Sequence, residues 1–222
     1  MKRISLSGLA TTFLALHALV ASAQQTTSGR ISHVEGTVFL DGKRLESSAT
    51  HVPMKENSLV RTEAGRIKIL LAPGVALRLA ENGSFRIVTN RPNDTRIELL
   101  SGSAIVLTDD NAVYTNPFNR LLAGKVTVIC ENAVTLSNFG AYRFDSQLMP
   151  TQREHRYCRF RVYKGNATVQ LSTVSAVVMS GETMTLNRAC GDHIPVSQFD
   201  IGDSDEFDRW SRQGTRSDAP HQ

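Results

Sequence analysis

Short segments in which apolar and polar residues alternate run along most of the chain, separated by Gly, Pro, Asn and Asp. Successive side chains of a β-strand point to opposite faces, so a strand with one buried face is apolar at every second position. The apolar spacing of an amphipathic helix is absent from residues 30–200. The alternation predicts strands that include residues 66–69, 75–79, 85–87, 97–99, 126–128 and 168–171.

Turn residues between these segments support the same interpretation. Asp41-Gly42 and Asn82-Gly83 suit type I′ hairpins, in which both central residues have positive φ. Pro73-Gly74 suits a type II turn, in which Pro restrains the first φ and Gly adopts the positive second one. The regular short spacing is typical of all-β solenoids, sandwiches and barrels. We therefore expect an all-β fold, a β-solenoid or sandwich-like stack of short antiparallel strands.

A faint internal repeat is consistent with stacked β layers. A glycine followed by a strand-like segment recurs at Gly36, Gly102 and Gly165, which are 66 and 63 residues apart. Near-equal spacing of this kind is typical of repeated β units. Chance is the alternative, because a glycine followed by β-branched residues is common in any β protein.

The C-terminal end has a different pattern. Residues 200–208 are rich in Asp and Glu, and Asp203 with Glu206 resembles a capping box that starts a short helix from Ser204 to Arg212. Phe207 and Trp210 share one face of this helix. Together they are candidates either for contact with a partner or for packing of the helix onto the β body. The sequence thus predicts an acidic and aromatic helix within 200–212 and a disordered tail at 213–222.

The N-terminus has the pattern of a secretory signal peptide over residues 1–23. Lys2 and Arg3 precede an apolar stretch, and Ala21-Ser22-Ala23 is typical of a cleavage site. Cleavage would leave Gln24 at the start of a 24–29 linker, followed by a β region over 30–199. The alternative is an uncleaved segment that tethers the protein to a membrane. We expect a protein exported to the periplasm or cell exterior, with no transmembrane segment after cleavage.

Charge and cysteine content narrow the class of protein. Loss of Lys2 and Arg3 with the signal peptide lowers the formal net charge from +4 to +2. A net charge this small does not indicate a nucleic acid partner, and we expect none. Outside the cytoplasm disulfides are permitted, and the three cysteines allow one bond and one free thiol. Cys130 lies on the same strand face as Val126 and Val128 and is expected to be a buried small hydrophobe. Cys158 and Cys190 are therefore the candidate disulfide.

Catalytic signals are weak. The histidines of the mature chain are scattered, and no nucleophile elbow, P-loop or zinc-protease motif occurs. Paired acids such as Asp94 with Glu98, or Asp109 with Asp110, would suit a secreted hydrolase or carbohydrate-active enzyme if they met in a cleft. Asp109-Asp110-Asn111 has turn chemistry instead, and the acidic residues 200–208 lack the ligand spacing of a calcium loop. We expect no catalytic residue, metal or cofactor.

A basic stretch at residues 153–161 has two interpretations. Its arginines and two aromatic residues could bind an anion or a nucleic acid. Alternation offers the simpler explanation, a half-exposed strand with Arg159 and Arg161 on one face and Cys158 and Phe160 on the other.

The segment Asn57 to Gly74 resembles the FecR domain. Leu59-Val60-Arg61-Thr62-Glu63-Ala64-Gly65-Arg66 is similar to the family's entry motif, and Leu77 to Ser84 and Ile97 to Ala104 are similar to its later strands, so the core match covers about residues 57–108. The resemblance implies a β-solenoid-like periplasmic domain. Regulatory members of the family are inner-membrane proteins that relay the state of an outer-membrane iron transporter to a sigma factor. No internal membrane span is apparent in this sequence.

Together these observations predict a non-enzymatic exported module that binds a protein or an envelope polymer. The resemblance to the FecR domain implies a link to envelope signalling. Exposed strand edges of such a fold can pair with a strand of the partner. A secreted hydrolase on a β scaffold and a purely structural envelope protein are the alternatives.

Overall fold

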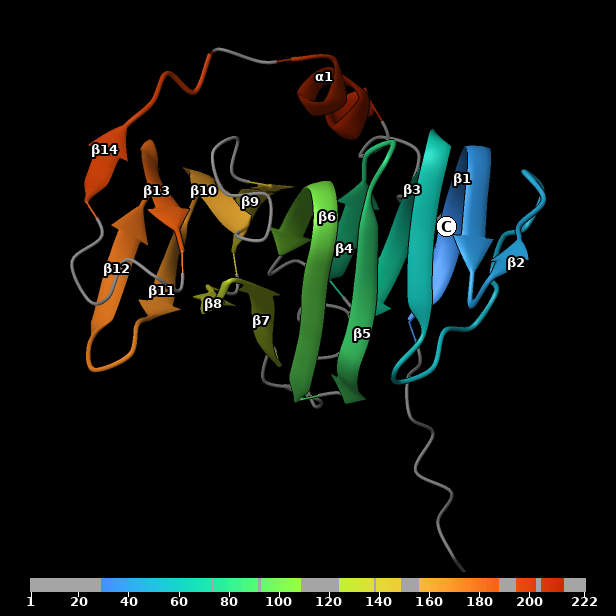
Figure 1. Cartoon of the computed structure of the whole chain (residues 1–222), viewed down its shortest axis with the longest axis horizontal. Helices are drawn as coiled ribbons and strands as arrows, with labels where there is room; N and C mark the ends of the chain where they lie inside the picture. Colours follow the sequence, from blue (N-terminus) through green and yellow to red (C-terminus); the bar gives the residue numbers. More distant parts are fainter. Residues whose placement is uncertain are drawn as a thin grey trace, which may run out of the picture.

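The computed structural model describes residues 29–72, 74–91, 93–108, 124–137, 139–148, 156–187, 195–202 and 205–213. These residues form fourteen strands and one short helix, α1 (Glu206–Gln213). Their arrangement is drawn in Figure 1. In chain order the strands are β1 (Arg30–Leu40), β2 (Lys43–Arg44), β3 (Leu59–Ala72), β4 (Val75–Leu79), β5 (Ser84–Arg91), β6 (Asp94–Thr108), β7 (Lys125–Cys130), β8 (Asn132–Leu136), β9 (Gly140–Leu148), β10 (Arg156–Lys164), β11 (Asn166–Gln170), β12 (Ser175–Met179), β13 (Glu182–Leu186) and β14 (Val196–Gln198).

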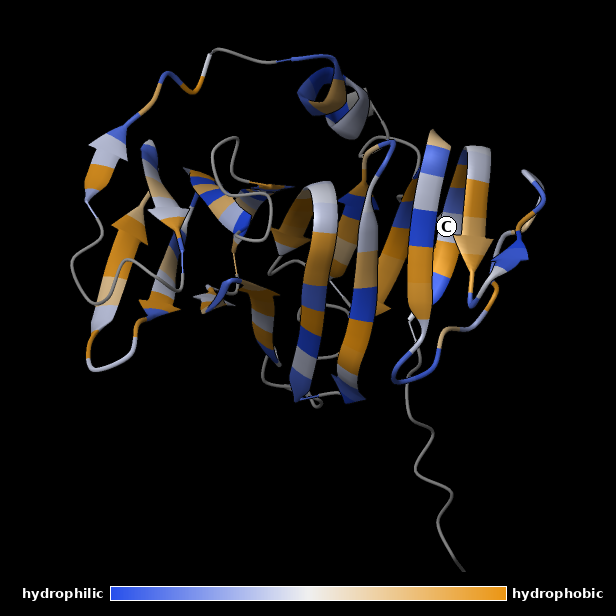
Figure 2. Ribbon diagram, viewed as in Figure 1, coloured by the Kyte–Doolittle hydropathy of each residue, from blue (hydrophilic) through white to orange (hydrophobic). Residues whose placement is uncertain are grey.

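A small closed barrel lies in the first half of the described chain. β3 pairs with β4, β4 with β6, β6 with β5, and β5 returns to β3. β1 extends this barrel from β3 and carries β2 at its edge. Alternate residues of each strand point inward, and most of the buried side chains of these strands are apolar. Figure 2 shows the resulting alternation of apolar and polar residues along β3, β5 and β6.

Strand β6 divides the rest of the sheet into two branches. Its first part, Asp94–Glu98, pairs in parallel with β7, which leads to β8, β11 and β12. Its second part, Gly102–Thr108, pairs antiparallel with β9, which leads to β10, β13 and β14. Apolar side chains of both branches belong to one buried core with those of the barrel.

Gly102 lies where β6 passes from one branch to the other. Its φ is +78°, and a Cβ at this position would lie 2.6 Å from the Cα of Gly83. Only glycine combines this left-handed conformation with such a close approach. Gly36 and Gly165, the other two glycines of the faint repeat, also have positive φ, at 69° and 84°. The three positions therefore share a local backbone conformation.

The predicted mostly β fold with a short helix near its C-terminal end is confirmed, whereas the β-solenoid is not. The long strands β3 and β6 each pair with more than two other strands. The chain closes a barrel through them and does not stack coils of equal length. Asp41 and Gly42 have the positive φ values predicted for their hairpin. The hairpin predicted at Asn82-Gly83 is wrong, because β4 and β5 each pair with β3 and β6 and not with one another.

A disulfide between Cys130 and Cys158 joins the two branches, with 5.8 Å between the Cα atoms. The predicted pair of Cys158 with Cys190 is therefore wrong, and Cys190 lies outside the described residues. The predicted burial of Cys130 is confirmed. Its partner escaped prediction because β7 and β10 belong to different branches, and their facing side chains are not related by any local spacing.

The helix begins later than predicted. It starts at Glu206, and Asp205 caps it by accepting a hydrogen bond from the amide of Asp208 at 2.9 Å. Asp203, the predicted cap, lies outside the described residues, as do residues 1–28 with the predicted signal peptide and residues 214–222 of the predicted tail. In the described part of the chain no helix has the length and apolarity needed to cross a membrane.

Candidate functional site

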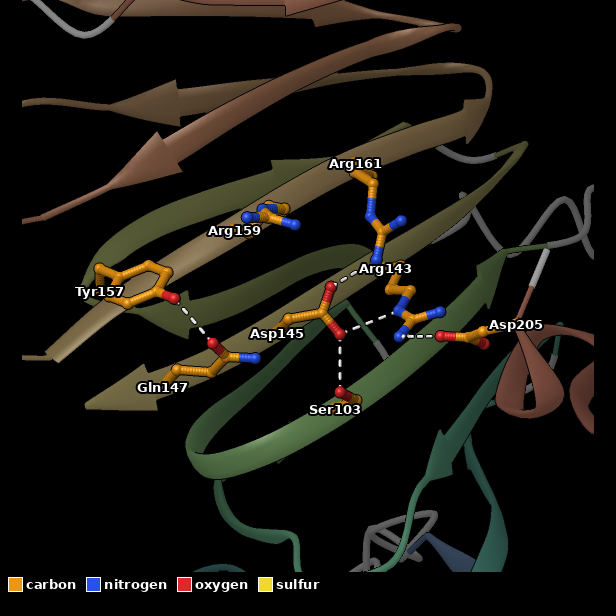
Figure 3. Close-up of a pocket in the computed structure, with 8 residues that line it drawn as sticks. All are labelled: Ser103, Arg143, Asp145, Gln147, Tyr157, Arg159, Arg161 and Asp205. Carbon is orange, nitrogen blue, oxygen red and sulfur yellow. Dashed lines mark hydrogen bonds and ion pairs between the residues drawn. The ribbon is translucent and has the colours of Figure 1, made fainter. Parts of the chain in front are cut away.

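A polar pocket of about 290 Å³ opens on the outer face of the sheet, between β6, β9, β10 and the start of α1 (Figure 3). Arginines and aspartates dominate its lining. The lining residues are Ser103, Arg143, Asp145, Gln147, Tyr157, Arg159, Arg161 and Asp205.

The register of β9 and β10 brings most of these side chains together. Tyr157 lies opposite Gln147, Arg159 opposite Asp145, and Arg161 opposite Arg143. Residues two apart on a strand share a face, so these three pairs form a polar ladder on the outer face. Cys158, Phe160 and Val162 lie on the inner face and are buried. The half-exposed strand predicted for the basic stretch is therefore confirmed for the described residues 156–161.

Arg143 is the centre of the charged network. Its guanidinium is almost fully buried and contacts three carboxylates, those of Asp145 at 2.9 Å, Asp205 at 2.7 Å and Asp208 at 2.9 Å. Asp205 and Asp208 belong to the segment that forms α1, so this arginine ties the helix to β9. The ring of Phe207 also lies against Arg143, with 5.6 Å from the guanidinium carbon to the ring centroid.

Asp145 is fully occupied by its neighbours. It accepts hydrogen bonds from the hydroxyl of Ser103 at 2.6 Å, from Arg143 at 2.9 Å and from Arg161 at 2.7 Å. Buried carboxylates need such partners, because an unpaired charge is strongly disfavoured away from water. The network therefore serves first to satisfy the buried charges between the sheet and α1.

The pKa shifts follow from this arrangement. Burial alone would lower the pKa of Arg143, but its hydrogen bond to Asp205 and the attraction of Asp145 and Asp208 outweigh burial and raise it. Burial likewise favours a higher pKa for Asp205, yet the hydrogen bonds from Arg143 and from the Asp208 amide lower that pKa to about 2. Burial is the main cause that raises the pKa of Tyr163, a hydrogen-bond partner of Asp208, to about 12.

The two aromatic residues of α1 lie against the β body. Phe207 is buried against Ala80 and Ile105, and the ring of Trp210 stacks on it with 5.9 Å between centroids. The indole of Trp210 donates to Glu35 at 2.9 Å, and Lys68 lies 5.2 Å from its ring centroid. In this structure the predicted candidates for partner contact, Phe207 and Trp210, thus fasten the helix to the sheet.

We expect acid to weaken this attachment. The pKa of folded Asp205, about 2, lies below the ordinary Asp value of 3.8, so its contribution to stability is complete above about pH 4 and is lost as pH falls towards 2. Trp210 is the chain's single tryptophan. Its fluorescence should therefore change over that range before far-UV circular dichroism reports loss of the sheet. The change should be smaller in Asp205→Asn, and identical profiles for the two proteins would contradict the assignment.

The acidic pairs considered for a hydrolase are not arranged as a catalytic pair. Asp94 and Glu98 lie four residues apart on β6, so their Cα atoms are about 13 Å apart, and they pair with Arg96 and Arg86 respectively. Asp109 and Asp110 lie outside the described residues. The pocket does contain two carboxylates, Asp145 and Asp205, but Arg143 bridges them. Among the described residues no three His, Cys, Asp or Glu side chains are grouped to hold a metal ion.

The open edges of the sheet differ in their chemistry. β2, β12 and β14 each have one neighbour among the described strands. β2 consists of Lys43 and Arg44, and β14 has three residues. β12 has five residues and no charge, and it exposes Val177 (57%) and Met179 (51%). Lysine and short length are the usual protections of a strand edge, so β12 is the least protected of the three.

Backbone groups are available at the edge of β12. The amide of Met179 donates to the side chain of Glu182 at 2.8 Å and so points away from β11. Backbone groups two residues apart point to the same side of a strand, so Val177 and Ser175 also present their amide and carbonyl groups to the open side. The position of this edge could not be predicted from alternation, which shows strand faces but not strand neighbours.

Comparisons with known proteins leave the family open. No protein-family model matches the chain, and no curated protein matches it, so the resemblance to the FecR domain stays a prediction. The chain is similar to two crystal structures from Parabacteroides distasonis ATCC 8503, each of a protein assigned as an anti-sigma factor. The structure at 1.65 Å resolution has 13% identity and a TM-score of 0.47, and the match covers 64% of this chain and 60% of that chain. The structure at 2.50 Å has 13% identity and a TM-score of 0.45, with 64% and 59% covered. The match thus spans about three fifths of those chains, and likeness at this level assigns no function to this one.

Proposed function

We propose that this chain is an exported, non-enzymatic module that binds a partner protein by adding a strand of the partner to the open edge of β12. The observation that carries the proposal is the edge itself. The backbone groups of Ser175 and Val177 face away from β11, Val177 and Met179 are exposed, and none of the five residues of β12 is charged. Among the described residues, the Glu182 carboxylate binds only the Met179 amide at one end of this edge. Strand addition uses main-chain hydrogen bonds for affinity and neighbouring side chains for specificity.

Export is part of the same proposal. The N-terminal pattern of residues 1–23 is that of a signal peptide, and a disulfide such as Cys130–Cys158 persists mainly in oxidising compartments. The resemblance to the FecR domain suggests the bacterial envelope as the place of action and envelope signalling as its setting.

The state of the pocket carboxylates favours a binding module over a hydrolase. A general acid needs a raised pKa at neutral pH, whereas the pKa of Asp205 is lowered to about 2. Asp145 accepts from Ser103, Arg143 and Arg161, so it has no remaining role as a free base. Both groups are better suited to hold α1 on the sheet.

A lysine at the centre of the edge should abolish partner binding. In Val177→Lys, a partner strand would have to pack beside a charge, and lysines on edge strands oppose such pairing. We expect at least about a tenfold loss of partner captured from envelope extracts of the producing cells, equivalent to about 1.4 kcal/mol. Cross-linking from β12 should identify the captured protein and place its strand.

Thr168→Lys is the matched control. Thr168 lies opposite Val177 and is also exposed, but β11 already has a neighbour on both sides. It should therefore retain the partner. Equal loss in both variants would indicate a face contact and contradict strand addition, and capture of an envelope polymer instead of a protein would contradict the choice of partner.

A further inference from the structure

The open end of the pocket presents hydrogen-bond donors that the protein itself does not use. Arg159 lies directly opposite Asp145 in the strand register, yet its guanidinium forms no hydrogen bond or ion pair within the described residues. The hydroxyl of Tyr157 donates to Oε1 of Gln147 at 2.7 Å, which leaves the NH2 group of Gln147 without a described acceptor. The Nε of Arg161 is buried and has no partner among the described residues.

The acceptors of the pocket are already engaged. Asp145 receives three donors, and Asp205 is bound to Arg143 and to the amide of Asp208. The lining thus holds three arginines and two aspartates. The two carboxylates lie beside Arg143 and Arg161 (Figure 3), and Asp208 also binds Arg143, so three carboxylates offset three arginines. Arg159 is the arginine of the lining that has no carboxylate partner of its own among the described residues.

The chain already places one peptide carboxylate in this pocket. Asp205, which precedes α1, reaches Arg143 at 2.7 Å and lines the same cavity. Arginine and amide donors recognise the planar carboxylate particularly well, because a guanidinium donates along parallel directions. A second carboxylate at the opposite end would be offered the guanidinium of Arg159 and the NH2 group of Gln147, which line the same pocket.

We infer that this pocket binds a carboxylate group of a peptide ligand, with Arg159 and Gln147 as its donors. The site is distinct from the edge of β12, since it involves β9 and β10. It therefore gives the protein a second contact, for an acidic side chain or a chain end of a partner. One charged group held at a solvated pocket gives weak binding, with a dissociation constant of about 1 mM.

Nuclear magnetic resonance can test this with small probes. The Nε–Hε signals of Arg159 and Arg161 and the side-chain amide of Gln147 are followed during titration with acetyl-aspartate N-methylamide. Acetyl-asparagine N-methylamide is the neutral control, and glucuronate and inorganic phosphate are the competing anions. Ionic strength is held constant, because salt screens exposed charges. We expect the aspartate probe alone to shift these signals strongly, with glucuronate and phosphate binding more weakly.

Variants distinguish binding of the probe at this site from a general effect of the protein's charge. Arg159→Met should weaken the aspartate probe at least about tenfold, and Gln147→Leu should weaken it to a smaller extent. Arg61→Met removes the same charge from an exposed pair elsewhere on the sheet and should have no effect. Val177→Lys should also leave probe binding unchanged, so failure of strand addition and failure of this site are distinguishable.

Three results would overturn the inference. The first is equal shifts from the aspartate and asparagine probes, which would exclude recognition of the carboxylate. The second is binding of phosphate or glucuronate at least as tight as that of the aspartate probe, which would assign the site to another anion. The third is unchanged binding in Arg159→Met.

Discussion

Replacing Arg143 with methionine is expected to lower the free energy of unfolding by about 3 kcal/mol, because it leaves buried carboxylates without their main partner. The side chains of Arg143 and Asp208 are 7% and 3% exposed, and Asp145 is buried beside them. Ser103, Arg161 and Tyr163 still contact these aspartates, which is why we expect the lower end of the range for broken buried pairs. Urea unfolding followed by circular dichroism would measure the change.

Two further variants make the origin of this loss clear. Arg61→Met breaks an exposed ion pair with Glu63 and should cost less than about 1 kcal/mol. Adding Asp208→Asn to Arg143→Met removes one of the stranded charges and should recover part of the stability. If Arg143→Met and Arg61→Met were equally mild, the network would not be what holds α1 on the sheet.

Removal of the Cys130–Cys158 disulfide is expected to lower the free energy of unfolding by about 3.5 kcal/mol. The two cysteines are 28 residues apart in the sequence, and the bond restricts the unfolded chain over that length. The bond also joins the two branches of the sheet, which meet elsewhere through apolar contacts and through the hydrogen bonds of the Tyr142 hydroxyl with Ser137 and Asn166. The double variant Cys130→Ala/Cys158→Ala, compared with the oxidised protein in urea, would measure the effect.

The control is Cys190→Ser, which should leave stability almost unchanged and should abolish the single free thiol. Peptide mapping of the unreduced protein should recover Cys130 linked to Cys158. Recovery of Cys158 linked to Cys190, or titration of three free thiols in the denatured protein, would contradict the observed pairing.

The candidate site was only partly predictable from the sequence. Alternation in Arg159-Phe160-Arg161 indicated that both arginines share an exposed face, and this holds because side-chain direction in a strand depends only on position. For the acidic residues near 205 the sequence predicts only the start of a short helix. Their actual partner, Arg143, is about sixty residues away and meets them only through the path of the chain.

The sequence by itself determined the strand-rich character of this protein, the buried face of the strands in which apolar and polar residues alternate, the hairpin at Asp41-Gly42 and a short helix near the end. These features depend on side-chain periodicity and on the conformations allowed to single residues, which are local properties. Only the tertiary structure decided that β6 is shared by two branches, that Cys130 bonds to Cys158, that Arg143 binds the helix and that β12 is left as an open edge. Each of these features is a contact between segments that are distant in the sequence. Such contacts form because both surfaces are buried together, and a local sequence pattern does not show which surfaces meet.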